Sequence, residues 1–142
     1  MNLFRHPHRV TYAECTLGNH IYYARFLDLF EKARGEFFRA IGTPFLSLQE
    51  EGILLPVLEA DVRYAAPVRY DELVRVEVVP RIHGRLRMEF RYTVIGPCDD
   101  ARVTGRTLHV ATGLDERPRR LPPQLADAMA PWLQCPGGPA TS

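Results

Sequence analysis

The side chains best suited to chemistry gather in one short stretch near the amino terminus. Thr16, Asn19 and His20 bring a hydroxyl, an amide and an imidazole within a few positions, and the carboxylate of Glu31 follows in the next segment. The imidazole of His titrates close to neutral pH and suits a general base. A Thr hydroxyl is a poor nucleophile unless a neighbouring base activates it. These residue types predict a site for general acid–base chemistry, with His20 as a candidate base.

A long helix is predicted immediately after this stretch, over residues 22–41. Its apolar residues recur as one broad stripe, and Gly42 followed by Thr43 and Pro44 marks its end. The first N–H groups of a helix have no acceptor within the helix and lie at the positive end of its dipole. A short strand and a polar turn lead into this helix, so we expect the turn and the free N–H groups to face one small volume. The stripe comprises Tyr22, Tyr23, Phe26, Leu27, Phe30, Ala33, Phe37, Phe38 and Ile41.

The second half of the chain changes to the period-two pattern of strands. Apolar and polar side chains alternate over residues 85–94, which predicts a strand with one buried face. Three further strands are predicted over about residues 54–65, 72–82 and 101–113, with turn signals between them. Strands joined by short connections pair antiparallel. A single amphipathic helix covering one face of such a sheet is an α+β arrangement.

Length and composition favour one domain over residues 1–134, with shorter helical segments expected at residues 45–51 and 121–134. The Pro- and Gly-rich remainder, residues 135–142, is predicted to be disordered. Three scattered cysteines argue against a disulfide framework and favour free thiols in a reducing cytoplasm. We expect no membrane span and no signal peptide. A net charge of +1 gives no support for nucleic acid as a partner.

A metal site is not expected. His6, His8, Cys15 and His20 are of the ligand types that zinc prefers, but their spacing matches none of the usual patterns. An exposed terminal segment would explain His6 and His8. His109 alternates with strand residues and is predicted to be a half-buried structural histidine. We therefore expect neither a metal nor a cofactor.

The stretch from Tyr12 to Arg34 resembles the opening motif of the hotdog-fold acyl-CoA thioesterases of the 4-hydroxybenzoyl-CoA thioesterase and YbgC type. That motif reads roughly Tyr-x-Asp-x-Asp-x-x-Gly-x-x-Tyr, then Tyr or Phe, then Glu-x-Ala-Arg. Residues 64–73 are similar to the family's Tyr-x-x-Pro-x-x-x-Asp-x-Leu junction, and residues 117–122 to its closing Lys/Arg-Pro-Arg-x-Leu-Pro. The resemblance implies a hotdog fold, in which an antiparallel five-stranded sheet wraps a long central helix.

The resemblance also implies an activity, the hydrolysis of a small or medium acyl, or an aryl, CoA thioester to the free acid and CoA. In the family, the backbone N–H at the position of Tyr23 polarises the thioester carbonyl, and this donor belongs to no side chain. Thr16 stands where the family carries its catalytic Asp. Another group must then activate water.

Three nearby groups are alternatives for that role. His20 is a general base by type, and Asn19 beside it can orient water, as a similar Asn and His pair does in plant acyl-carrier-protein thioesterases. Glu31 matches the family's helix carboxylate, but it can equally fix the preceding turn or pair with Arg34 one turn on. Glu14 ranks third, because a continuing strand would place it about 6–7 Å from the threonine.

The basic residues of the second half are arginines, whose forked donors suit phosphate groups. We expect contacts with the phosphates of CoA from Arg85, Arg117, Arg119 and Arg120. The family's active sites lie between two protomers, which implies a homodimer or homotetramer. Loss of the Asp leaves a second interpretation open, a hotdog module that binds acyl-CoA or acyl-carrier-protein without hydrolysing it.

Overall fold

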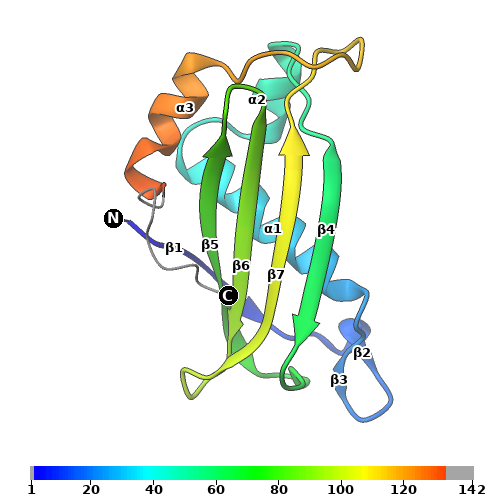
Figure 1. Ribbon diagram of the computed structural model, residues 1–142. Coiled ribbons are helices and arrows are strands. Elements are labelled where there is room, and N and C mark those ends of the chain that lie inside the picture. Colours follow the sequence, from blue (N-terminus) through cyan, green and yellow to red (C-terminus); the bar gives the residue numbers. More distant parts are fainter. Residues whose placement is uncertain (1, 134–142) are drawn as a thin grey trace.

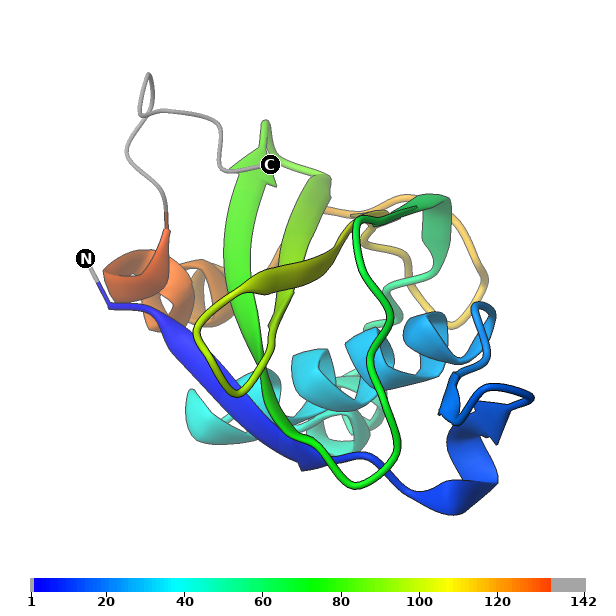
Figure 2. The ribbon, with the colours of Figure 1, turned by 90° about the horizontal axis from the view of Figure 1, so that it is seen from below.

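A five-stranded antiparallel sheet covers one long helix in the computed structural model, which describes residues 2–133 (Figure 1). The strands lie in the order β1-β5-β6-β7-β4, and α1 runs beneath one face of the sheet (Figure 2). The sheet consists of β1 (Phe4–Arg9), β4 (Val57–Tyr64), β5 (Leu73–His83), β6 (Arg87–Ile95) and β7 (Ala101–Val110). The helices are α1 (Arg25–Ala40), α2 (Phe45–Glu50) and α3 (Pro123–Met129), with short 3-10 turns η1 (Tyr12–Glu14) and η2 (Ala130–Trp132). The α+β prediction, with one long helix wrapped by a five-stranded sheet, is confirmed.

The first strand of the sheet lies earlier than predicted. β1 pairs with β5, with Phe4 opposite Val78, whereas the residues just before the polar turn form only a two-residue strand outside the sheet. Along β1, Phe4, His6 and His8 point inward and alternate with exposed residues. The exposed terminal segment predicted for His6 and His8 is therefore wrong, since His8 is buried. Two of these three inward positions carry a polar imidazole, which conceals the period of the strand.

The long helix begins later than predicted. Tyr22 lies in a turn, where its N–H donates to the carbonyl of Glu14 at 2.9 Å and its carbonyl accepts the N–H of Arg25 at 2.9 Å. α1 therefore starts at Arg25 rather than at residue 22. Its predicted end is confirmed, because the last helical residue is Ala40 and Gly42 follows with a φ of 85°.

The other predicted elements are present with shifted ends. β4 begins at Val57 rather than near residue 54, because Leu54 forms an isolated bridge with Thr112. The predicted terminal helix breaks into α3 and η2. Residue 134 and the tail predicted to be disordered, residues 135–142, lie outside the described residues. Within residues 2–133, no helix has the length and hydropathy that a membrane crossing requires.

α1 packs closely against the sheet at Phe30. The ring of Phe30 stacks on Tyr92 of β6, with the ring centroids 4.4 Å apart and the planes within 5° of each other. On β7, the adjacent position is Gly105, where an added Cβ would lie only 2.2 Å from Phe30 Cε2. The glycine therefore leaves the space that lets the helix lie against the strands, with Phe37 and Phe38 fully buried further along.

The opposite face of the sheet carries paired charges. Glu89 is buried on this face, with Arg91 Nε at 3.1 Å from one carboxylate oxygen and Arg106 Nε at 3.5 Å from the other. Arg106 also pairs with Glu59 of β4 at 2.9 Å. These arginines lie on strand faces and neutralise neighbouring carboxylates, so a ligand is not needed to explain them.

We expect Gly105→Ala to lower the free energy of unfolding by about 1–3 kcal/mol, because the new methyl group forces the Phe30 ring off Tyr92. Urea unfolding at equilibrium measures this loss. The double variant Phe30→Leu with Gly105→Ala removes the ring atoms in conflict, so its loss should be clearly smaller than the sum of the two single losses. Additive losses would contradict the proposed clash.

Candidate active site

The predicted polar residues lie on a small hairpin made of β2 (Cys15–Thr16) and β3 (His20–Ile21). Gly18 and Asn19 close its loop with φ values of 91° and 58°, in the left-handed region that Gly and Asn tolerate best. The N–H of Ile21 donates to the carbonyl of Val68 at 2.8 Å. The N–H of Tyr70 donates to the carbonyl of Asn19 at 2.7 Å. The segment between β4 and β5 therefore holds the hairpin in place.

The backbone N–H of Tyr23 has no hydrogen-bond acceptor among residues 2–133. The bonds of Tyr22 with Glu14 and Arg25 fix the peptide that carries this N–H group. On the other side, the hydroxyl of Tyr64 donates to the Tyr23 carbonyl at 2.9 Å. Burial, with a smaller effect of Tyr23, raises the pKa of Tyr64, so its hydroxyl stays a protonated donor. The residues ahead of α1 thus present a free donor in a fixed orientation.

A pocket of about 460 Å³ adjoins Tyr23. Three of the predicted catalytic residues, Thr16, His20 and Tyr23, line it together. Its other walls are mostly apolar and include Phe26 and Tyr64. None of the described residues that line it is Asp or Glu. Asn19, also predicted for the site, shapes the loop through its backbone and is not part of the lining.

His20 has a ring nitrogen available for proton transfer. Its Nδ1 lies 3.3 Å from the carbonyl of Ile21. Because a carbonyl can only accept, Nδ1 carries a hydrogen, and in the neutral form of the ring the lone pair is on Nε2. No hydrogen bond within the described part of the chain uses Nε2. A Cβ at Gly18 would lie 3.2 Å from His20 Cδ2, so the glycine also leaves room for the imidazole.

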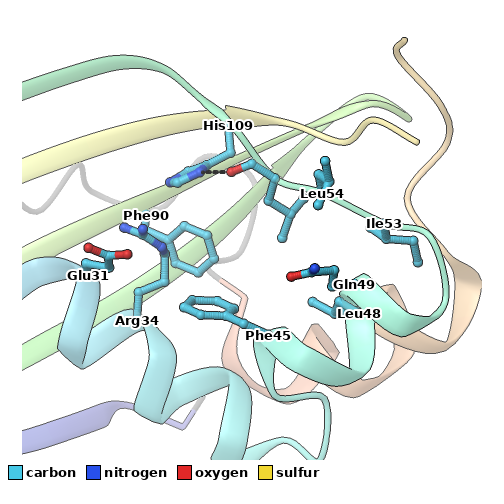
Figure 3. A pocket seen from close by; sticks show the side chains of 10 residues that line it. Glu31, Arg34, Phe45, Leu48, Gln49, Ile53, Leu54, Phe90 and His109 are labelled. Atoms are coloured by element: carbon cyan, nitrogen blue, oxygen red, sulfur yellow. Dashed lines mark hydrogen bonds between the residues drawn. The ribbon is translucent and has the colours of Figure 1, made fainter. Parts of the chain in front are cut away.

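Glu31 lies elsewhere, in a second pocket of about 190 Å³ between α1, α2 and the segment before β4 (Figure 3). The pair that we considered between Glu31 and Arg34 does not form, because Arg34 Nη1 donates to the Tyr92 hydroxyl at 2.8 Å. Glu31 is exposed and takes part in none of the hydrogen bonds or ion pairs found within residues 2–133. The two candidate bases, His20 and Glu31, therefore line different pockets of one protomer.

A chain of hydrogen bonds behind the second pocket escaped the sequence analysis. It begins with the bond from Arg34 to the Tyr92 hydroxyl. The Tyr92 hydroxyl lies 2.7 Å from Thr107 Oγ1. Thr107 Oγ1 lies 2.9 Å from His109 Nε2. His109 Nδ1 lies 2.9 Å from the carbonyl of Leu55 (Figure 3). Burial lowers the pKa of His109 to about 4, so the ring is neutral at neutral pH. One sign of this hydrogen-bond chain was present in the sequence, the position of His109 within a predicted strand.

Glu14, the third candidate base, is already engaged. Both of its carboxylate oxygens lie 2.9 Å from His8 Nε2. The N–H and hydroxyl of Thr11 donate to it at 2.8 and 2.9 Å. Burial alone would raise the pKa of Glu14, but the hydrogen bonds from Thr11 and His8 outweigh burial, and the pKa is lowered. This cluster connects β1 to the turn before the hairpin.

The predicted phosphate-binding arginines lie at the far end of α1 from Tyr23, around the loop that follows β7 (Figure 1). Arg119 Nη1 donates to the carbonyl of Gly52 at 3.2 Å, and the carbonyl of Arg85 accepts the N–H of Leu121, next to Arg120, at 2.9 Å. α1 has 16 residues and so is about 24 Å long. The arginines and the Tyr23 donor therefore occupy opposite ends of one protomer.

Comparisons with known proteins agree on one family. A family model described as the thioesterase-like superfamily matches residues 10–133. The acyl-CoA thioesterase YbgC of Haemophilus influenzae is 34% identical over 77 residues, which are 54% of this chain and 57% of the relative. The putative acyl-CoA thioesterase YneP of Bacillus subtilis is 20% identical over 132 residues, 93% of this chain and 94% of the relative. The solved DHNA-CoA thioesterase of Staphylococcus aureus superposes with a TM-score of 0.84 at 25% identity, covering 92% of this chain and 91% of that one.

We expect Glu14→Gln to destabilise the protein at neutral pH by roughly 1–3 kcal/mol, since it weakens charge-assisted hydrogen bonds. A carboxyl group whose folded pKa is lowered stabilises the fold above its unfolded pKa, near 4.5, and loses that contribution as the pH falls through the folded pKa. Unfolding measured from pH 7 to pH 3 should therefore show a wild-type loss in acid that the variant lacks. Parallel pH curves for the two proteins would disprove this role, and Glu36→Gln on the half-exposed side of α1 is the matched control.

Proposed function

Because this chain belongs to the thioesterase-like superfamily, we propose that it hydrolyses a small or medium acyl, or an aryl, CoA thioester to the free acid and CoA. One observation carries the proposal: the Tyr23 N–H lies ahead of α1, without an acceptor in residues 2–133, against a mostly apolar pocket. A backbone donor at the positive end of a helix stabilises the oxyanion that forms when water attacks a thioester carbonyl.

His20 is the base that shares this pocket. The oxygen of water bonds to the carbonyl carbon while a proton passes to His20 Nε2, and the carbonyl electrons move onto the oxygen held by Tyr23. Collapse of this intermediate breaks the C–S bond, and the leaving CoA thiolate takes the proton from His20. Thr16, which we place at the family's Asp position, offers a hydroxyl that can hydrogen-bond the attacking water.

A second copy of the chain would complete the site. β4 is an edge strand with one free side, and Val57, Leu58 and Tyr64 on it are each about half exposed, at 50%, 47% and 50%. Unpaired edges of this kind favour pairing with another strand. Two β4 strands paired antiparallel would place the Tyr64 end of one copy beside the Val57 end of the other. A homodimer, or a homotetramer built from it, is our proposal.

This pairing would let Glu31 and the arginines of one copy contribute to the reaction in the His20 pocket of the other. The Tyr64 end of β4 adjoins the Tyr23 donor, and the Val57 end follows the wall of the Glu31 pocket. A dimer with a two-fold axis therefore brings the Glu31 pocket of one copy toward the His20 pocket of the other. The loop that carries Arg117 and Arg119 approaches with it, where it can meet the phosphates of CoA.

We place the protein in the cytoplasm. Cys15 and Cys98 are both free thiols, and reduced thiols persist in that compartment. Burial, with the charge of Glu14 adding to it, raises the pKa of Cys15, which makes this thiol a poor nucleophile.

A second candidate is a module that binds acyl-CoA or acyl-carrier-protein without turnover. Its support is the lack of a carboxylate among the described residues that line the Tyr23 pocket. The Tyr23 donor and the pocket would suffice for binding. A free-thiol release assay over a panel of acyl- and aryl-CoA thioesters separates the two functions, because only the enzyme exceeds the rate of hydrolysis in solvent.

Replacing the base should abolish most of the turnover. We expect His20→Ala to lower kcat by about 10²-fold or more, the usual range for a general base. Glu31→Gln should cause a comparable loss if the second copy's carboxylate assists the attack. Thr16→Asp restores the family residue in the same pocket and should raise kcat. His83→Gln and Glu36→Gln, which lie outside both pockets, are the matched controls.

Mixing the two impaired variants tests the shared site. A heterodimer of His20→Ala and Glu31→Gln contains one site with both native groups, so an equal mixture should recover about a quarter of wild-type activity after subunit exchange. No recovery would argue against a site shared between copies. Full activity in both folded single variants would show that neither side chain is catalytic.

Removing a phosphate contact should affect binding rather than chemistry. We expect Arg119→Ala to raise KM roughly two- to tenfold with little change in kcat, and the effect should shrink as the salt concentration rises. Steady-state kinetics at two ionic strengths measures both effects. Arg39→Ala, on the exposed last turn of α1, is the control. An unchanged KM in the Arg119 variant would remove this residue from the site.

A further inference from the structure

The pocket between α1 and α2 contains a half-buried cation without a carboxylate partner (Figure 3). Arg34 takes part in none of the ion pairs found within residues 2–133, whereas Arg25 and Arg39 on the same helix each pair with a carboxylate. Its guanidinium lies 6.0 Å from the centre of the Phe45 ring, which covers the cation. A guanidinium that is partly removed from water and unpaired is a binding site for an anion.

The hydrogen-bond chain behind Arg34 fixes the orientation of this cation. A carbonyl can only accept, so His109 Nδ1 donates to Leu55, and the neutral His109 Nε2 must accept from Thr107. Thr107 Oγ1 then accepts from Tyr92. The Tyr92 oxygen accepts from Arg34 Nη1. Donor and acceptor are therefore assigned for every bond of this hydrogen-bond chain. The orientation of the Arg34 guanidinium is fixed before any ligand binds.

Two donors of Arg34 remain for a ligand. Nη1 is bonded to Tyr92, while Nε and Nη2 have no hydrogen-bond partner in the described part of the chain. Nε–H and Nη2–H form one edge of the planar guanidinium, and that edge matches the two oxygens of a carboxylate. The geometry thus favours a planar organic anion over a single rounded ion.

The charges around Arg34 leave the inner part of the pocket positive. Glu31 is the only acidic residue among those that line the pocket, and it is exposed, so water screens its charge. His109 is buried, with both ring nitrogens bonded within the protein, and Gln49 is neutral. Arg34, half-buried, is therefore the dominant charge toward the interior.

The remaining lining sets the size of the ligand. Leu48, Ile53 and Phe90 are buried apolar walls of a cavity of about 190 Å³. An apolar cavity of about 150 Å³ is known to hold a benzene molecule. The volume here suits a molecule with about seven non-hydrogen atoms, one end apolar and the other anionic.

We propose that this pocket binds a short-chain organic carboxylate of about five carbons, with its carboxylate on the Nε and Nη2 edge of Arg34 and its hydrocarbon chain against Leu48 and Phe90. The carboxylate has two sources, a free acid in solution or the far end of an acyl group held by a second copy. The second source rests on the proposed thioesterase function and on the dimer, whereas the first does not.

Titration calorimetry at pH 7 with 3-methylbutanoate tests the site, and 3-methylbutanamide serves as the neutral match. We expect saturable binding of the carboxylate and at least tenfold weaker binding of the amide. Arg34→Gln should weaken carboxylate binding at least tenfold, whereas Arg39→Gln should leave it unchanged. The comparison of the two ligands uses the wild-type protein and holds even if Arg34→Gln fails to fold. Equal binding of acid and amide, or no saturation by the acid, would overturn the proposal.

Kinetics then separates the two sources. If 3-methylbutanoate raises KM for an acyl-CoA without changing kcat, the pocket receives the end of the acyl group. If it lowers kcat at saturating substrate, the pocket is a separate site for the free acid. Either effect should be lost in Arg34→Gln, and an effect that persists in this variant would show that the acid acts outside the Arg34 pocket. A protein without thioesterase activity would still show the calorimetric difference between acid and amide, so failure of the proposed function is distinguishable from failure of this site.

Discussion

The depth at which α1 packs against the sheet determines where the functional groups lie. The Phe30 ring rests on Tyr92 and fills the space left by Gly105, so the helix cannot shift without a clash or a void. One end of the helix then presents the Tyr23 N–H beside the hairpin, and Arg34 reaches the Tyr92 hydroxyl one turn after Phe30. Tyr92 supports both the packing and the hydrogen-bond chain, and therefore joins the core to the pocket that Arg34 lines.

The groups that we propose for the reaction are spread along one helix. The Tyr23 end offers a donor, an imidazole and apolar walls, the middle of the helix offers Glu31 and Arg34, and the far end adjoins the arginine loop. The antiparallel pairing through β4 that we propose would bring groups from two copies together, because a two-fold axis exchanges the ends of the helix.

Much of the fold could be predicted from the sequence, because its signals are local. The stripe of α1, its stop at Gly42 and the alternation of β6 all depend on neighbours in the chain. β1 was missed because His6 and His8 occupy inward positions that a pattern of apolar residues does not reveal. Thr16, His20 and Tyr23, which are close in the sequence, line one pocket. The bond from Arg34 to Tyr92 joins residues 58 positions apart, and no spacing rule within a helix could anticipate that Glu31 would lose this partner.

The donor of Tyr23 has an evolutionary consequence because it belongs to the main chain. Substitutions in the hairpin can alter the proposed base, yet the N–H that we propose as the carbonyl donor does not depend on which side chain stands at position 23. If the proposed roles hold, the group that binds the carbonyl and the group that activates water can therefore change independently of each other.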